Sequence, residues 1–179
     1  MNSSGARLFH RIPVLFPATA LAIIALDQAT KYWASHLSGL EYGAYPPRGG
    51  IEVIPGYLSL VYTTNTGAAW GMFEGHGVIL ASLGIAAIAA ICIFRKALGL
   101  DRMLMQFVFG LITGGIAGNI VDRVCVGGVT DFIDFHIRSI YRWPTFNVAD
   151  SAMVVGVAIY VATALFERDR PQEKADTGS

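Results

Sequence analysis

The sequence predicts a mainly α-helical membrane protein, a bundle of four transmembrane helices with a small extracytoplasmic β-sheet between the first helix and the second. The 179-residue chain is 54% hydrophobic, above the share of about 45–50% that is typical of soluble domains. Its mean hydropathy is +0.51. Four apolar runs each come near the length of about 20 residues that crosses a bilayer as a helix, and about 40 residues rich in strand formers separate the first run from the second.

These runs divide what we expect to be one membrane domain over residues 1–179. The basic start and the first run also suit a secretory signal peptide. However, that run continues into the polar residues 27–31 without a small-residue cleavage site, and more spans follow. The expected segments are spans at 12–33, 77–94, 103–121 and 148–166, a sheet segment at 37–74, a connection bearing the candidate catalytic residues at 122–147 and a cytoplasmic tail at 167–179.

The basic residues predict the orientation. Eight of the thirteen Lys and Arg residues fall on one side of the four spans, which the positive-inside rule assigns to the cytoplasm together with both termini. The polar ends of spans one, three and four then lie at the outer interface, on the same side as the three tryptophans. The eight residues are Arg7, Arg11, Arg95, Lys96, Arg102, Arg168, Arg170 and Lys174.

The segment between the first two spans predicts an antiparallel sheet at the membrane surface. Residues 51–54 precede a Pro55-Gly56 turn, and the β-branched and aromatic residues 57–64 follow it. Next come Asn65 and Gly67 among small residues, which favours either close approach of the backbone to a ligand or an ordinary turn entering the membrane.

The composition excludes several function classes. The formal net charge is zero, which gives no reason to expect nucleic acid as a partner. Two cysteines are too few for a disulfide framework. The four histidines form no His-x-x-x-His pair, and neither a Gly-x-Ser-x-Gly motif nor a phosphate-binding Walker loop is present. We therefore expect no metal site.

Charged residues within the spans are expensive to insert and usually face the bundle interior. Asp27 and Lys31 are four residues apart, so we expect a structural ion pair on one helix face in preference to a catalytic role. Asp122 has a neighbouring partner in Arg123, which favours a structural or substrate-orienting role. Asn119 and Asp122 follow the small-residue stripe Gly110-x-x-x-Gly114-x-x-x-Gly118, on which another helix can pack closely.

Two carboxylates remain as candidates for acid–base chemistry. Asp131 has no adjacent cation, whereas Asn147 and Asp150 suit the N-cap of the last span. That helix end could also aim Asp150 at a substrate. Two acids brought close share a proton, so one can activate water while the other polarises a carbonyl, and such a pair hydrolyses a peptide bond.

Two other classes of function stay open on these residues. One is a proton-coupled carrier that uses Asp27, Asp122 and Asp150 as relay groups. It is disfavoured because the acids gather at one interface and form no chain across the bilayer. The other is a non-catalytic packing subunit.

The motifs taken together resemble those of the bacterial lipoprotein signal peptidase (signal peptidase II) family. One alone would be a weak signal, but five in this order cover nearly the whole chain outside its tails. The matching segments are Asp27-Gln28-x-x-Lys31, Asn65-Thr66-Gly67-Ala68-Ala69-Trp70, Gly114-Gly115-x-x-Gly118-Asn119-x-x-Asp122-Arg123, Val129-x-Asp131-Phe132 and Phe146-Asn147-x-Ala149-Asp150-Ser151.

The resemblance implies a monomeric, four-helix aspartyl endopeptidase of the bacterial inner membrane, surrounded by membrane lipids, with a periplasmic β-cradle and an active site at the outer leaflet. Its substrates would be diacylglyceryl prolipoproteins, cut just before the lipidated cysteine, and it would need no cofactor. The sequence departs from the family pattern at Thr130 and at an extra acid, Asp134. The implied roles are catalysis by Asp131 and Asp150, substrate binding by Asn65, Gly67, Asn119, Arg123 and Asn147, and structural support by Asp27, Lys31 and Asp122.

Overall fold

The computed structural model describes residues 14–68 and 72–168. Trp70, in one of the sequence motifs, lies outside these residues, as do the basic residues Arg7, Arg11, Arg170 and Lys174. The helices are α1 (Leu15–Tyr32), continued by a π-helical turn η1 (Trp33–Leu37), then α2 (Gly77–Ile93), α3 (Met103–Cys125) and α4 (Val148–Arg168). The strands are β1 (Ile51–Ile54), β2 (Leu58–Asn65), β3 (Val129–Ile137) and β4 (Tyr141–Arg142).

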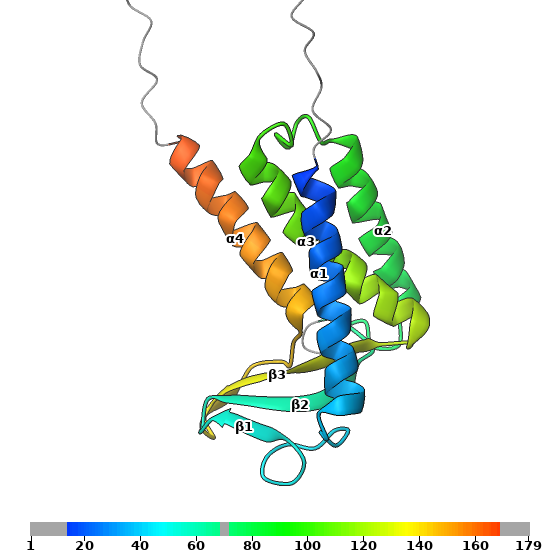
Figure 1. Cartoon of the computed structure of the whole chain (residues 1–179), viewed down its shortest axis with the longest axis vertical. Helices are drawn as coiled ribbons and strands as arrows, with labels where there is room; N and C mark the ends of the chain where they lie inside the picture. The colour runs from blue at the N-terminus through cyan, green and yellow to red at the C-terminus, as the bar shows by residue number, and fades with distance from the viewer. Residues whose placement is uncertain (1–13, 69–71, 169–179) are drawn as a thin grey trace, which may run out of the picture.

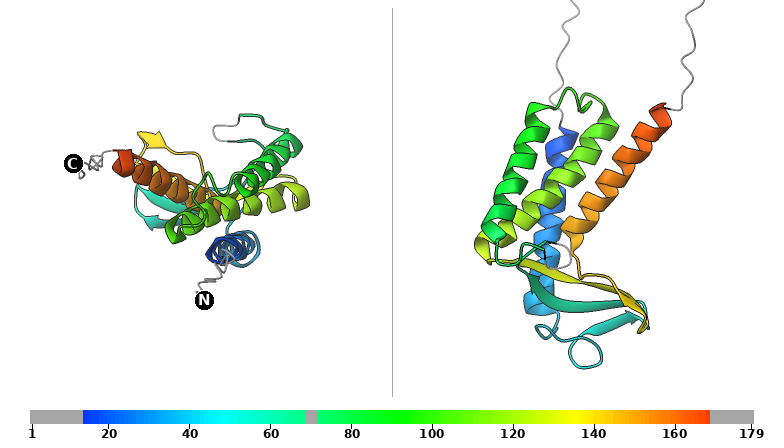
Figure 2. Two further views of the ribbon diagram at one scale, coloured as in Figure 1. Left: turned by 90° about the horizontal axis from the view of Figure 1, so that it is seen from above. Right: turned by 180° about the vertical axis from the view of Figure 1, so that it is seen from behind.

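The four helices stand together at one end of the sheet, as Figure 1 shows. The start of α1, the α2–α3 connection and the end of α4 all lie at the opposite end of the molecule from the sheet (Figure 1 and the right-hand view of Figure 2). The basic residues 95, 96 and 102 of the α2–α3 region are therefore far from the sheet. The polar ends of α1, α3 and α4 instead meet where the sheet begins.

Helix α3 is the centre of the bundle, because it contacts each of the other three helices. Its small-residue stripe receives α1. A Cβ added at Gly110 would lie 2.6 Å from the Thr19 Cβ, and one added at Gly114 would lie 2.8 Å from the Ala20 carbonyl oxygen. Both distances are shorter than packed side chains allow, so only glycine lets the two backbones come this close.

The sheet extends further than the sequence predicted. All four strands are antiparallel to their neighbours, in the order β1-β2-β3-β4. We expected a sheet formed only by residues between the first two helices and a connection without strands at 122–147. In fact α3 continues to Cys125, and β3 and β4 lie within that connection. The reason is that Val129–Ile137 finds a long partner in β2, where Thr63 faces Asp131 and Leu60 faces Ile133.

Two helices of the described residues, α3 and α4, are long and apolar enough to cross a membrane. Helix α2 is apolar but shorter, at 17 residues, and the 18-residue α1 carries Asp27 and Lys31 near its end. The outward faces of α2 and α4 expose large apolar side chains, for example Val78 and Val154. Such faces are stable in a lipid environment, where an apolar surface needs no cover from the rest of the protein.

The close contact at Gly114 gives a first prediction. On an exposed helix, replacing glycine with alanine stabilises the fold by about 1 kcal/mol. The Gly114→Ala change should have the opposite sign, a loss of about 1–3 kcal/mol, because its methyl group meets the backbone of α1. Thermal unfolding of the purified protein in detergent measures the effect. The matched control is Gly77→Ala, whose added Cβ has its nearest neighbour at 3.8 Å, and which should be neutral or stabilising. Equal melting temperatures for the two variants would contradict the packing argument.

Candidate active site

The structure brings Asp131 of β3 and Asp150 of α4 to one cavity of about 660 Å³. Asp131 is buried, with 1% of its surface exposed, and Asp150 is partly buried. The cavity extends along α4 towards Val154 and Val155, whose side chains are about half exposed or more. We call it the aspartate cavity. It therefore joins two acids to the apolar outer face of the bundle. It is lined by Asn65, Gly67, Ala68, Asn119, Arg123, Val129, Asp131, Phe135, Trp143, Pro144, Thr145, Phe146, Asp150, Ser151, Met153, Val154 and Val155.

Asn147 connects the two acids. Its Nδ2 donates a hydrogen bond of 2.7 Å to Asp131 Oδ1. Its Oδ1 accepts the Asp150 N–H at 3.0 Å, while its own N–H donates to Asp150 Oδ2 at 3.3 Å. The last two contacts form a reciprocal cap at the start of α4. The capping pattern read from the sequence is thus present, and the same asparagine also holds Asp131.

Asn119 fixes Asp150 from the side of α3. Its Nδ2 donates to Asp150 Oδ1 at 2.7 Å. Its Oδ1 accepts the Lys31 ammonium at 3.0 Å and the Asn147 amide at 3.3 Å. These donors assign the orientation of the Asn119 amide. Because they leave only the nitrogen for Asp150, the lysine sets which end of the amide faces the acid.

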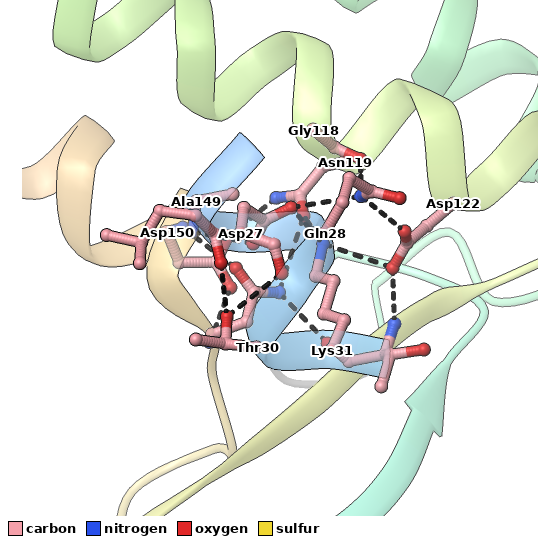
Figure 3. A network of polar contacts seen from close by, with 12 residues as sticks. Asp27, Gln28, Thr30, Lys31, Gly118, Asn119, Asp122, Ala149 and Asp150 are labelled. Atoms are coloured by element: carbon pink, nitrogen blue, oxygen red, sulfur yellow. Dashed lines mark hydrogen bonds and ion pairs between the residues drawn. The ribbon is translucent and has the colours of Figure 1, made fainter. Parts of the chain in front are cut away.

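Lys31 lies between two buried carboxylates. Its ammonium is 2.8 Å from Asp27 Oδ2 and 3.0 Å from Asp122 Oδ2. Gln28 Nε2 donates to the same two acids, at 3.2 Å to Asp27 and 2.9 Å to Asp122. We call these four residues the Lys31 cluster. Figure 3 shows it at the junction of α1, α3 and α4.

Each acid of the Lys31 cluster also holds one residue of the backbone that carries the aspartate pair. Asp27 Oδ1 accepts the N–H of Ala149 at 3.0 Å, the residue before Asp150. Asp122 Oδ2 accepts the N–H of Thr130 at 2.8 Å, the residue before Asp131. Lys31 thereby links the two backbone segments that position the pair. The cluster is structural in its contacts, as the four-residue spacing of Asp27 and Lys31 predicted.

The expected partnership of Asp122 with Arg123 is wrong. Adjacent residues on a helix point in different directions, so Asp122 faces the Lys31 cluster while Arg123 faces the aspartate cavity. The Arg123 guanidinium donates to the Gly67 carbonyl oxygen at 3.0 Å and to the Asn119 carbonyl oxygen at 3.2 Å. It thereby joins the segment after β2 to α3 at the wall of the cavity that holds Asp131 and Asp150.

Asn65 and Gly67 complete the wall of the cavity on the side of the sheet. Asn65 Oδ1 accepts the N–H of Gly67 at 2.9 Å, so the asparagine stabilises a local turn. The Asn65 side chain also bonds to Asp131. A Cβ on Gly67 would lie 2.6 Å from the carbonyl oxygen of Met72. The turn predicted for this segment is therefore present, and it brings an amide to the acid. Close approach of its backbone to a ligand stays a prediction.

The environment of Asp131 favours its protonated form. Burial, followed by the negative charge of Asp150, raises the pKa of Asp131 from its ordinary value near 3.8 to about 7. Hydrogen bonds from Asn147 and Asn65 act in the opposite direction. Near neutral pH Asp131 can therefore keep a proton, which is the condition for an acid to act as a donor beside an ionised partner.

Sequence reasoning brought these residues together only in part. It gave no role to Gln28, although that residue stands in a recognised motif, and it missed Thr130 as a backbone link to both Asp122 and Asn147. The extra acid, Asp134, lies outside the aspartate cavity. It is fully buried, 3.1 Å from His136 and 3.6 Å from Arg142. Among the described residues, His, Cys, Asp and Glu side chains form no group of three that could hold a metal ion.

The sequence is similar to signal peptidase II proteins. Residues 19–166 match the family described as signal peptidase (SPase) II. The lipoprotein signal peptidase of Oleidesulfovibrio alaskensis is 38% identical over 83% of this chain and 92% of that protein. The lipoprotein signal peptidase of Geobacter metallireducens is 35% identical over 89% and 95%.

Two solved structures of bacterial membrane enzymes have the same fold. One is 30% identical with a TM-score of 0.76 and covers 95% of this chain and 96% of that one. The other is 33% identical with a TM-score of 0.71 and covers 90% and 96%. Because the family match and these likenesses extend over most of its length, the chain belongs to the signal peptidase II family of aspartic peptidases.

Proposed function

We propose that this protein removes signal peptides from diacylglyceryl-modified prolipoproteins by cleaving before the lipidated cysteine, with Asp131 and Asp150 as its catalytic pair. The observation that carries the proposal is that two acids from β3 and α4 line one cavity and share Asn147 as a hydrogen-bonding partner. The similarity to the lipoprotein signal peptidases described above supports the same substrate class.

The two acids have different environments, which suggests different roles. Asp150 lies in the first turn of α4, where the positive end of the helix dipole favours a carboxylate. It also accepts N–H groups from Asn119 and Asn147. Asp131 is the buried member and has its pKa raised to about 7. Asp150 is therefore the general base, and protonated Asp131 is the general acid.

The reaction follows from these roles. A water molecule between the acids gives a proton to Asp150 while its oxygen attacks the scissile carbonyl carbon, and Asp131 donates its proton to the carbonyl oxygen. The tetrahedral intermediate then breaks its C–N bond as the amine takes a proton from Asp150, while a hydroxyl of the intermediate returns a proton to Asp131. Arg123, which donates to carbonyl oxygens of the protein at the edge of the cavity, and Asn65 would orient the substrate backbone.

The cavity suggests how the substrate lies. Its opening beside the exposed Val154 and Val155 suits the apolar signal peptide and the lipid chains. We infer that all four helices cross the inner membrane, with both termini in the cytoplasm and the sheet on the outer side. The basic α2–α3 region at the end away from the sheet supports this orientation. A monomer suffices in this scheme, because both acids come from one chain.

Removing either acid should abolish cleavage. Asp131→Asn and Asp150→Asn keep the size and hydrogen-bonding capacity of each side chain but cannot exchange the proton, so turnover of a lipidated prolipoprotein should fall by at least about 10³-fold. Gel analysis of the cleaved product measures turnover. Asp101→Asn, on the exposed α2–α3 connection, is the matched control and should cleave normally. Turnover retained in either active-site variant would exclude the pair as the catalytic residues.

The protonated state of Asp131 gives the pH dependence its sign. As pH rises through about 7, Asp131 loses its proton, two carboxylates then face one another, and the general acid is lost. We expect kcat/KM to fall about tenfold per pH unit above this point. Initial rates between pH 5 and 9 test this, with circular dichroism to verify folding at each pH. Activity that stays constant to pH 9 would contradict the assignment.

The raised pKa also affects stability. Between the ordinary pKa of an aspartate and about 7, the folded protein binds a proton at Asp131 that the unfolded chain releases, so stability falls as pH rises through this window. The Asp131→Asn variant lacks this contribution. Wild type should therefore lose stability relative to the variant between about pH 4 and 7, which chemical denaturation at several pH values measures. If the stability difference between wild type and variant stays constant over this pH range, the pKa of Asp131 is not raised in the folded protein.

The Lys31 cluster is predicted to hold the aspartate pair in place. Lys31→Met leaves Asp27 and Asp122 buried without their cation, and breaking such a pair costs about 3–5 kcal/mol. The melting temperature of the purified protein should drop, and cleavage should drop with it. Lys96→Met removes the same charge from an exposed position at the far end of the bundle and should change neither. A Lys31→Met protein with wild-type stability would refute the structural role.

A further inference from the structure

A second cavity of about 420 Å³ lies beside the aspartate cavity. The two cavities share the four lining residues Asn65, Trp143, Pro144 and Thr145. The second is also lined by Thr63, Thr64 and Thr66, at the end of β2 and just after it, so we call it the threonine cavity. The aspartate cavity reaches the apolar face of α4. The threonine cavity is instead lined by residues from the end of β2 and from β4.

One wall of the threonine cavity presents an arginine in a fixed orientation. The Arg142 guanidinium carbon lies 4.2 Å from the centre of the Tyr45 ring, a cation–π contact. Its Nε lies 3.6 Å from Oδ1 of the fully buried Asp134. That distance is long for a hydrogen bond, and within residues 14–68 and 72–168 the guanidinium donates none. Arg142 is therefore held by a ring and a charge while its N–H groups remain available to a ligand.

The opposite charge in the cavity is Glu74. Its side chain is exposed, and no ion pair involves it in the described part of the chain. Arg142 is held in place on β4, whereas Glu74 has no such support and would lose more conformational freedom on binding. The arginine should consequently dominate the charge preference of the site, and the glutamate should weaken it.

We propose that the threonine cavity binds the first residues of the mature lipoprotein, those just after the lipidated cysteine, and that Arg142 gives it a preference for an acidic side chain there. This inference rests on the proposed function. A substrate cut in the aspartate cavity has its apolar parts in the lipid-facing region, so the polar chain beyond the cut must leave by another route. The threonine cavity adjoins the proposed cleavage site, and most of its lining residues have polar side chains that can contact a peptide backbone.

The expected effect is moderate and falls on binding. Arg142 is 47% exposed, and partly exposed ion pairs contribute little, so substrates with Asp and with Lys should differ by about twofold to fivefold. The contact is remote from the reacting atoms and is equally strong in the ground and transition states. It should therefore alter KM and leave kcat nearly constant.

The test uses three lipidated peptide substrates that differ only in the second residue of the mature part, which is Asp, Ala or Lys. The purified enzyme should cleave them with kcat/KM in that order. Arg142→Ala should remove the preference, Arg142→Glu should invert it, and Glu74→Gln should strengthen it. Arg48→Ala, an exposed arginine on the same side of the molecule that does not line the cavity, is the matched control and should keep the wild-type ratio.

Each outcome has a separate meaning. Equal kcat/KM of the wild-type enzyme for the Asp and Lys substrates overturns this inference even if no variant folds. A ratio unchanged in the Arg142 variants also overturns it, and so does a change that appears only in kcat. Absence of cleavage of the Ala substrate by the wild-type enzyme would instead contradict the proposed function itself.

Discussion

The contact on which the rest of the structure depends is that of one ammonium group with two buried carboxylates. Lys31 neutralises part of the charge of Asp27 and Asp122 where α1 meets α3, a position at which an unpaired acid would be very unfavourable. The remaining oxygens of the acids accept backbone N–H groups from α4 and β3. A single cation thus fixes the relative position of two segments that are distant in the chain.

This arrangement explains why a small protein can place two acids close together. Like charges at short range repel, so the local backbone must resist their separation. Here the resistance comes from hydrogen bonds to the residues just before the acids and from Asn147, which contacts both. The close packing of α1 on Gly114 is the condition for these contacts, because it brings the end of α1 within reach of α3 and α4.

Much of this architecture was predictable because membrane proteins have strong local signals. Apolar runs located the helices, and the stripe that includes Gly114 indicated a close helix contact. The cap formed by Asn147 could be read from its spacing to Asp150. The pairing of β3 with β2 was not predictable, since strand partners are chosen by tertiary contacts and not by local pattern. For the same reason the partner of Asp122 was misassigned: sequence neighbours on a helix point apart, and its true partner, Lys31, comes from another helix.

Asp150 both takes part in the cap of α4 and faces Asp131, and this double role bears on how the helix bundle assembles. Asp131 precedes α4 in the chain and Asp150 lies in its first turn, while the N–H of Ala149 closes on Asp27 of the first helix. The two acids consequently meet only when the first and the last helices have both joined α3. A partly inserted chain has one acid without its companion, and so the proposed catalytic pair forms only in the fully assembled bundle. Peptide-bond hydrolysis by this pair would therefore begin only after all of these helices have packed together.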